Sequence, residues 1–164
     1  MNRIFICALC ALAVIALTAC GAPKAPVSAG SVTETAPAEA IQEEAEMPML
    51  TVSINGKPVP VIWEDNESVA ALRELSQSAP ITVNMSMYGG FEQVGSLGTR
   101  LPRNDVQTTT QAGDIVLYSG NRIVIFYGSN SWAYTRLGRV DGVTSEELAA
   151  LLGNGDVTLT IEYK

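Results

Sequence analysis

Short runs in which apolar and polar residues alternate dominate the chain from residue 49 to residue 164. The clearest is ITVNMSMY (81–88), which places Ile81, Val83, Met85 and Met87 on one side. Strict alternation over such a length predicts a half-buried β-strand. Glycine, asparagine and proline, which favour turns, separate this run from several similar ones. We therefore expect a domain that is mainly β, made of many short strands.

The segment MLTVSINGKPVPVIWE (49–64) contains the strongest turn signal in the chain. Asn55-Gly56 is typical of a two-residue hairpin turn. The register of this turn would set apolar residues opposite one another, Val52 with Val59 and Leu50 with Val61. Pro58 and Pro60 have no N–H group to donate, so the second strand is expected at a sheet edge or at the seam of a barrel.

Two short helices interrupt the strands. NESVAALRELSQ (66–77) has apolar residues at helical spacing and Asn66 as its N-cap, and Thr144 with Glu147 forms a capping box that opens a helix ending at Leu152. Between them, the run 114–126 is apolar on both faces and predicts a central hairpin, with its turn at Gly120-Asn121. These elements indicate a closed or nearly closed barrel, although a β-sandwich with two peripheral helices would give a similar pattern.

Several longer motifs resemble a known family. YGGFEQVGSLG (88–98), Leu101-Pro102, GDIVLYSGNRIVIFYG (113–128) and NSWAYTRLGRV (130–140) occur in this order at short spacings. Together they are similar to the cyclophilin-like domain family of small bacterial proteins, which has diverged from the true prolyl isomerases. The resemblance covers 49–164 and implies a closed β-barrel of about eight strands, with the two helices capping its open ends.

The resemblance implies little about activity. True cyclophilins use an arginine beside a hydrophobic proline pocket, and this chain has no histidine and lacks the Phe-His-Arg strand that carries that arginine. We therefore expect a binding module for a peptide or a small molecule, without chemistry of its own. The alternative is a peptidyl-prolyl cis-trans isomerase-like enzyme that acts on extracytoplasmic peptides.

Composition excludes several kinds of site. Without histidine the chain can form neither a Ser-His-Asp triad nor a zinc site with imidazole ligands, and its three cysteines all lie within the first twenty residues. The acidic group of Glu64, Asp65 and Glu67 is interpreted as favourable charge at a helix N-terminus rather than a calcium site. We expect no metal and no cofactor. Acidic residues outnumber basic ones by 17 to 10 without a basic stripe, so nucleic acid is not an expected partner.

Six residues form the candidate ligand-binding site. Alternation should place Trp132, Tyr134 and Arg136 on one face of a strand. Two aromatic rings beside a guanidinium form a surface suited to a peptide or a small carboxylate. The glycine-rich segment would contribute further aromatics as a groove wall, although Gly89-Gly90 is better explained as a barrel corner. A Trp–Tyr pair in the core, with the arginine reaching solvent, is the alternative for the strand. The candidate residues are Tyr88, Phe91, Asn130, Trp132, Tyr134 and Arg136.

The first 48 residues differ in character from the rest. A short basic start and an apolar stretch end in Leu17-Thr18-Ala19-Cys20, which resembles a bacterial lipoprotein signal. This predicts a signal peptide over 1–19, acylation of Cys20, and attachment to the cell membrane on its extracytoplasmic side. The segment 20–48 is rich in Ala, Pro and Glu and has no apolar periodicity, so it is expected to be a disordered acidic tether.

Overall fold

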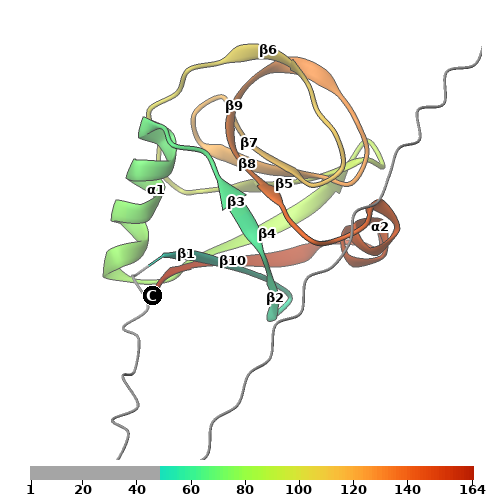
Figure 1. Cartoon of the computed structure of the whole chain (residues 1–164), viewed down its shortest axis with the longest axis horizontal. Coiled ribbons are helices and arrows are strands. Elements are labelled where there is room, and N and C mark those ends of the chain that lie inside the picture. Colours follow the sequence, from blue (N-terminus) through green and yellow to red (C-terminus); the bar gives the residue numbers. More distant parts are fainter. Residues whose placement is uncertain (1–48) are drawn as a thin grey trace, which may run out of the picture. The chain divides into compact units, whose positions relative to one another are not determined.

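The computed structural model describes residues 49–164, so the expected signal peptide, Cys20 and tether lie outside the described residues. None of the helices in this part of the chain is long and apolar enough to cross a membrane. The described residues form ten strands and two helices (Figure 1). In chain order these are β1 (Leu50–Ile54), β2 (Lys57–Val59), β3 (Val61–Trp63), α1 (Glu67–Ser78), β4 (Ile81–Tyr88), β5 (Glu92–Ser96), β6 (Val106–Thr109), β7 (Asp114–Tyr118), β8 (Arg122–Phe126), β9 (Ser131–Val140), α2 (Ser145–Leu152) and β10 (Val157–Tyr163).

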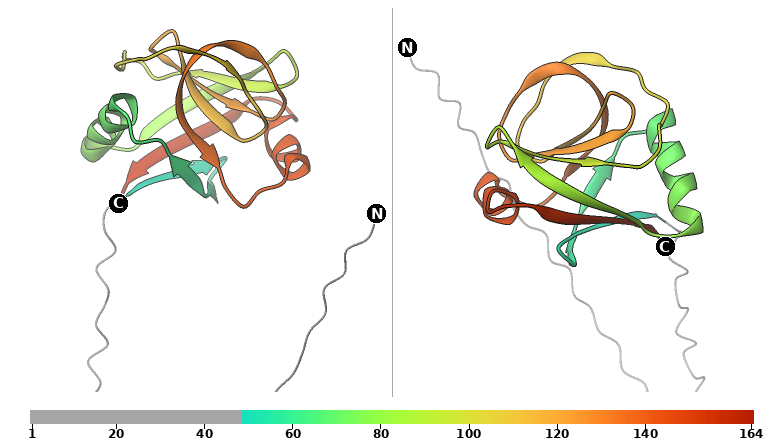
Figure 2. Two further views of the ribbon diagram at one scale, coloured as in Figure 1. Left: turned by 45° about the horizontal axis from the view of Figure 1, so that its top comes forward. Right: turned by 180° about the vertical axis from the view of Figure 1, so that it is seen from behind.

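The strands form one antiparallel sheet that curls into a nearly closed barrel (Figures 1 and 2). Its order is β2-β1-β10-β4-β5-β8-β7-β9-β3, and β6 pairs with the first half of β9. The two edge strands, β2 and β3, are neighbours in sequence and only Pro60 separates them. The chain therefore steps from one edge of the sheet to the other at the barrel seam, as the prolines predict. The mainly β barrel fold with two helices is confirmed.

The predicted hairpin is confirmed in its turn and corrected in its length. Asn55 and Gly56 both have positive φ, and Val52 lies opposite Val59. The predicted pairing of Leu50 with Val61 is wrong, because the chain leaves β1 at Pro60 and Val61 pairs with Val140 on β9 instead. This break, together with the extra strand β6, also explains why the structure has more strands than the eight expected.

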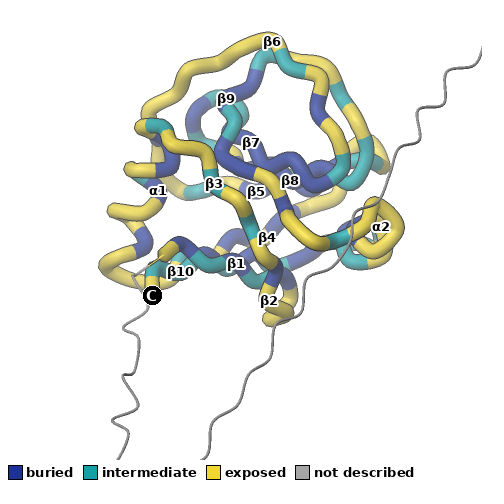
Figure 3. The backbone as a smooth tube through the Cα atoms, viewed as in Figure 1, coloured by how far each residue is buried: buried dark blue, intermediate teal, exposed yellow. Residues whose placement is uncertain are grey.

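The central hairpin of β7 and β8 is covered on both faces, as predicted. One face contributes to the main core, which also takes Val69 and Leu72 from α1 and Leu148 and Leu152 from α2. The two helices lie on opposite sides of the barrel (Figure 1). Residues of β7 and β8 are mostly buried, whereas those of β6 are largely exposed (Figure 3). The turn differs from the prediction, because Tyr118 pairs with Arg122 and positive φ falls at Ser119 and Gly120.

A second apolar cluster lies on the other face of this hairpin. It consists of buried residues from β7, β8 and β9 with partly buried neighbours, namely Val116, Val124, Phe126 and Tyr134, packed against Phe91, Val94 and Tyr118. The first half of β9 pairs with β6 rather than with β7, so the strand leaves the barrel wall and arches over this outer face (Figure 1). The first half of β9 therefore covers part of the outer face of the barrel.

Gly89 and Gly90 form the turn between β4 and β5, and both have positive φ. A Cβ at Gly90 would meet nothing within 4 Å, so backbone strain alone opposes a side chain there. We expect Gly90→Val to lower the free energy of unfolding by about 1–2 kcal/mol, the usual strain of a left-handed conformation. Gly90→Asn should cost much less, because asparagine tolerates this region. Urea denaturation checks both, and equal losses for Val and Asn would contradict the strain argument.

Candidate functional site

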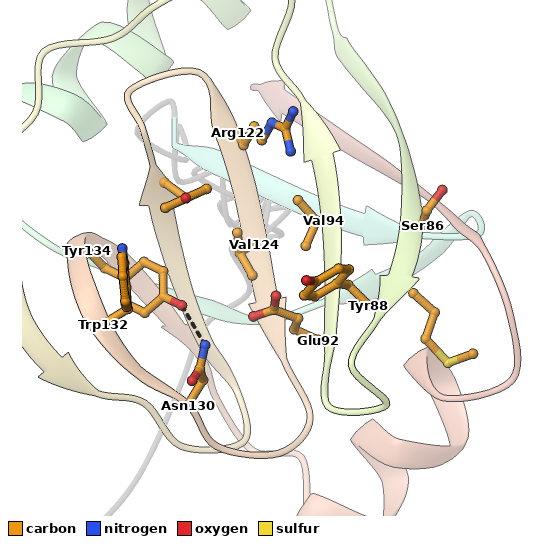
Figure 4. Close-up of a pocket in the computed structure, with 11 residues that line it drawn as sticks. Ser86, Tyr88, Glu92, Val94, Arg122, Val124, Asn130, Trp132 and Tyr134 are labelled. Atoms are coloured by element: carbon orange, nitrogen blue, oxygen red, sulfur yellow. Dashed lines mark hydrogen bonds between the residues drawn. The ribbon is translucent and has the colours of Figure 1, made fainter.

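A cavity of about 560 Å³ opens on the outer face of the barrel, between the sheet and the arch of β9 (Figure 4). Its lining comes from five strands and one loop. These contribute Ser86, Met87 and Tyr88 from β4, Glu92 and Val94 from β5, Tyr118 from β7, Arg122 and Val124 from β8, Trp132 and Tyr134 from β9, and Asn130 from the preceding loop.

The floor of the cavity is apolar in the middle and charged at its two ends. Val94 and Val124 lie opposite each other in the pairing of β5 with β8. Because side chains alternate along a strand, Glu92 shares the face of Val94 and Arg122 shares the face of Val124. In the same register Glu92 lies opposite Phe126, whereas Arg122 lies opposite Ser96. The two charged residues are thus separated along the strands by about 13 Å at the rise of a β-strand.

Aromatic rings form one wall. Tyr134 is only 5% exposed and meets Tyr118 and Phe126 edge to face, with ring centroids 6.1 and 5.7 Å apart. Trp132, two residues earlier on the same strand, is 57% exposed at the rim. This burial gradient follows from the path of β9, which enters the second apolar cluster at Tyr134. The wall therefore has a fixed inner ring and an exposed outer one.

The loop before β9 is held by backbone and side-chain hydrogen bonds. Asn130 Nδ2 donates to the Tyr134 hydroxyl at 3.0 Å. The backbone of Asn130 is fixed in turn by Thr110, a fully buried residue whose N–H and hydroxyl donate to the Asn130 carbonyl at 2.8 and 3.0 Å. The Thr110 hydroxyl also accepts from the Asn130 N–H at 3.0 Å. Asn130 and Tyr134 are thus preorganised at the cavity.

Glu92 is the unusual residue of this site. It is 6% exposed, and its Oε2 atom is buried without a hydrogen-bond partner among the described residues. Burial raises the pKa of the Glu92 carboxyl. Burial also raises the pKa of Tyr134, with a further contribution from the negative charge of Glu92. A buried, unpaired carboxyl is unfavourable for folding, so its presence beside a cavity indicates a functional position.

We expect Glu92→Leu to raise the free energy of unfolding by about 1 kcal/mol at pH 7, because the substitution removes a buried polar group without a partner. A raised pKa means that the folded protein binds the proton more tightly than the unfolded chain. The stabilising effect of that protonation is present below the ordinary pKa of 4.5 and is lost as the pH rises through the folded value. The advantage of the variant should therefore grow with pH above about 4.5.

Denaturation of both proteins between pH 4 and pH 8 checks this expectation. A variant that is less stable than the wild-type protein at every pH would show that Glu92 has a structural partner. Glu74→Leu is the matched control, because Glu74 is an exposed carboxylate on α1, and we expect it to change stability by less than about 0.5 kcal/mol.

Four of the six predicted site residues line the cavity, and two do not. Tyr88, Asn130, Trp132 and Tyr134 are brought together, whereas Phe91 packs against the second apolar cluster. Arg136 lies outside the cavity lining.

Arg136 instead forms ion pairs with Asp114 at 2.9 Å and with Glu64 at 3.5 Å. Alternation holds from Trp132 to Arg136, but Trp132 belongs to the half of β9 that pairs with β6, while Arg136 belongs to the half that pairs with β7. The curl of the strand separates their environments.

Two charged residues of the cavity lining, Glu92 and Arg122, are not among the predicted site residues. Within EQVGS, the second residue is also buried, since Gln93 lies inside the barrel and donates to the carbonyls of Leu152 and Gly155, each at 2.6 Å. Neither Glu92 nor Arg122 could be singled out from the sequence, because their positions at the cavity depend on the pairing of β5 with β8. Gly95 lies within β5, opposite Met85.

The structure thus defines a small β-barrel protein. Its barrel is nearly closed, is accompanied by two helices and has a cavity on its outer wall. The chain belongs to the Cyclophilin-like family, whose profile matches residues 52–162. Among solved structures, the chain is similar to a hypothetical protein from Archaeoglobus fulgidus determined in solution. The two share 17% identity with a TM-score of 0.48, over 70% of this chain and 93% of the other. No curated protein matches the sequence.

Proposed function

We propose that the domain is a binding module that holds a peptide segment or a small molecule in the cavity on the outer face of the barrel. The observation that carries this proposal is Glu92, a buried residue whose Oε2 atom has no hydrogen-bond partner within residues 49–164, beside a preorganised, aromatic-lined cavity. Binding sites typically combine an apolar, aromatic lining with a few convergent polar groups, and this cavity has that composition.

A thermal-shift screen of small molecules and short peptides against the full chain tests the proposal. Each hit is titrated against Trp132→Ala, which shortens the exposed wall of the cavity, and against Ile62→Ala. Ile62 is a similarly exposed apolar residue, but it lies on β3 outside the cavity lining. We expect weaker binding in the first variant only. Hits that weaken equally in both variants, or a screen without hits, would contradict the proposal.

A second candidate is prolyl isomerisation, favoured by one observation. Arg122 lines the same cavity as the apolar residues Met87, Val94 and Val124, and an isomerase needs an arginine beside an apolar pocket for proline. An assay with a proline-containing peptide decides between the candidates. Acceleration that disappears in Arg122→Ala would support the enzyme, and the absence of acceleration by the wild-type protein would exclude it for that peptide.

We also propose that the domain is attached to the cell membrane through acylated Cys20, on the extracytoplasmic side. The support is the order of basic start, apolar stretch and Leu17-Thr18-Ala19-Cys20 in the sequence. Metabolic labelling with palmitate should mark the wild-type protein and not Cys20→Ser, and the variant should leave the membrane fraction. A wild-type protein that stays unlabelled beside a labelled control lipoprotein would overturn this proposal.

A further inference from the structure

We infer that the cavity binds an organic cation, an alkylammonium or guanidinium group, with the positive charge against Glu92. This inference rests on the proposed binding function and names the ligand class for the same site. Figure 4 shows Glu92 within the cavity, between Tyr88 on one side and Asn130 with Tyr134 on the other.

The first argument is the missing counter-charge. Ion pairs among the described residues involve the basic groups of Arg103, Arg136 and Lys164, and Glu92 takes part in none of them. Arg122, the one basic residue in the cavity lining, lies at the far end of the floor. A carboxylate removed from water is stabilised best by a cation that arrives with hydrogen-bond donors. An ammonium or guanidinium group supplies both, whereas a carboxylate or phosphate ligand would be repelled at this end.

The second argument is the aromatic surround. Tyr88, Trp132 and Tyr134 line the same cavity as Glu92, and aromatic ring faces attract cations through their quadrupole. The combination of a carboxylate with several aromatic rings favours a cation over a neutral apolar group. A neutral group would gain from the rings alone and would leave the carboxylate unpaired.

The third argument concerns the rest of the ligand. From Glu92 the floor continues over Val94 and Val124 to Arg122. The apolar middle suits an aliphatic stem, and the guanidinium at the far end suits a carboxylate or carbonyl oxygen. A lysine or arginine side chain has this sequence of groups, either in a free amino acid or within a peptide. The chemistry shared by both sources is a cation on an aliphatic stem.

The test uses the full chain and four probes. N-acetyl-lysine methylamide represents the peptide-borne cation, cadaverine the free amine, N-acetyl-norleucine methylamide the stem without its charge, and N-acetyl-glutamate methylamide the opposite charge. Binding is followed by tryptophan fluorescence, since Trp132 is at the cavity rim and Trp63 is outside the lining, and by calorimetry. We expect the lysine probe to bind at least about tenfold more tightly than the norleucine probe, as a charge-assisted contact does.

Substitutions identify the charged residue that is responsible for the preference for the lysine probe over the norleucine probe. Glu92→Gln keeps the shape of the side chain and should abolish the preference for lysine over norleucine. Glu74→Gln removes an equal charge from the exposed face of α1 and should leave the preference unchanged. Lowering the pH should weaken binding of the lysine probe to the wild-type protein as the Glu92 carboxyl becomes protonated, because the proton and the ammonium compete for the same oxygen atoms. Arg122→Ala should weaken the lysine probe, whose carbonyl oxygen faces the guanidinium, and should not weaken cadaverine, whose second ammonium group Arg122 would repel.

The outcomes separate this inference from the proposed function. Equal binding of the lysine and norleucine probes, or a preference that survives in Glu92→Gln, overturns the cation while a binding module remains. If only cadaverine binds, the site is one for free amines. If only the lysine probe binds, whose α-amino and carboxyl groups are blocked while its ε-ammonium is free, the site is one for peptides. Should Glu92→Gln fail to fold, the inference is tested on the wild-type protein alone, by comparing its affinity for the lysine and norleucine probes and by following that difference with pH. The absence of any hit, both here and in the broad screen, overturns the function itself.

Discussion

Arg136→Ala should lower the free energy of unfolding by about 2–4 kcal/mol, because it leaves a buried carboxylate without its counter-charge. Asp114 is 2% exposed, and its Oδ1 atom lies 2.9 Å from Arg136 Nη2. The other carboxylate oxygen accepts from the Gln111 N–H at 2.9 Å, so Asp114 holds the turn before β7 as well as pairing with the arginine. Partial exposure of the arginine places the expected loss below that of a fully buried pair.

Urea denaturation at pH 7 measures this loss, and Arg139→Ala is the matched control. Arg139 is an exposed arginine on the same strand whose side chain makes one long hydrogen bond, to the Ala112 carbonyl at 3.5 Å. We expect its removal to change stability by less than about 0.5 kcal/mol. Asp114→Asn introduced beside Arg136→Ala should recover part of the loss, since the orphaned charge is then gone. Similar midpoints for both arginine variants would show that the ion pair is unimportant.

Gly138→Val should lower the free energy of unfolding by about 3 kcal/mol or more. A Cβ at Gly138 would lie 2.6 Å from the Ile62 carbonyl oxygen and 3.2 Å from the Trp63 Cα. These are backbone atoms of β3, so relief requires the two strands to separate. Gly138 pairs with Trp63 at the barrel seam, and the Trp63 indole N–H donates to the Leu50 carbonyl of β1 at 3.0 Å. Separation of β3 from β9 therefore disturbs the contact that links the two ends of the sheet.

Comparison with Gly90→Val isolates the effect of the close approach. Both variants introduce the same side chain, but Gly90 has free space around its Cβ position and only the backbone strain opposes the change. Denaturation should give a loss for Gly138→Val at least about 1 kcal/mol greater than for Gly90→Val, and Trp63 fluorescence should shift in the first variant only. Equal losses would mean that the strand contact at the seam relaxes without difficulty.

The local elements of this fold could be predicted because their causes lie within a few residues of sequence. Asn66 caps α1 by accepting from the Val69 N–H, and Thr144 with Glu147 forms the reciprocal capping box of α2. The Asn55-Gly56 turn sets the register of β1 with β2. In each case the paired residues are at most seven positions apart in the sequence, so the residue types alone determine the geometry.

The candidate site could be predicted only in part, because its members meet through long-range pairing. Asn130, Trp132 and Tyr134 are close in sequence, and their common position followed from alternation and adjacency. Glu92 and Arg122 reach the same cavity through the pairing of β5 with β8, about thirty positions apart. No local sequence pattern predicts that this pairing will bury the Glu92 carboxyl without a partner among residues 49–164.

The sequence by itself determined both helices, most of the strands, the seam at the prolines and the resemblance to the family, since alternation, capping and turn chemistry act between near neighbours. The tertiary structure alone decided where each side chain of β9 ends. Tyr134 enters an outer apolar cluster, Trp132 stays at the rim and Arg136 neutralises Asp114, although all three alternate on one strand. The physical reason is the curl of the sheet: it gives successive parts of one strand different partners, and so gives one face of that strand different surroundings.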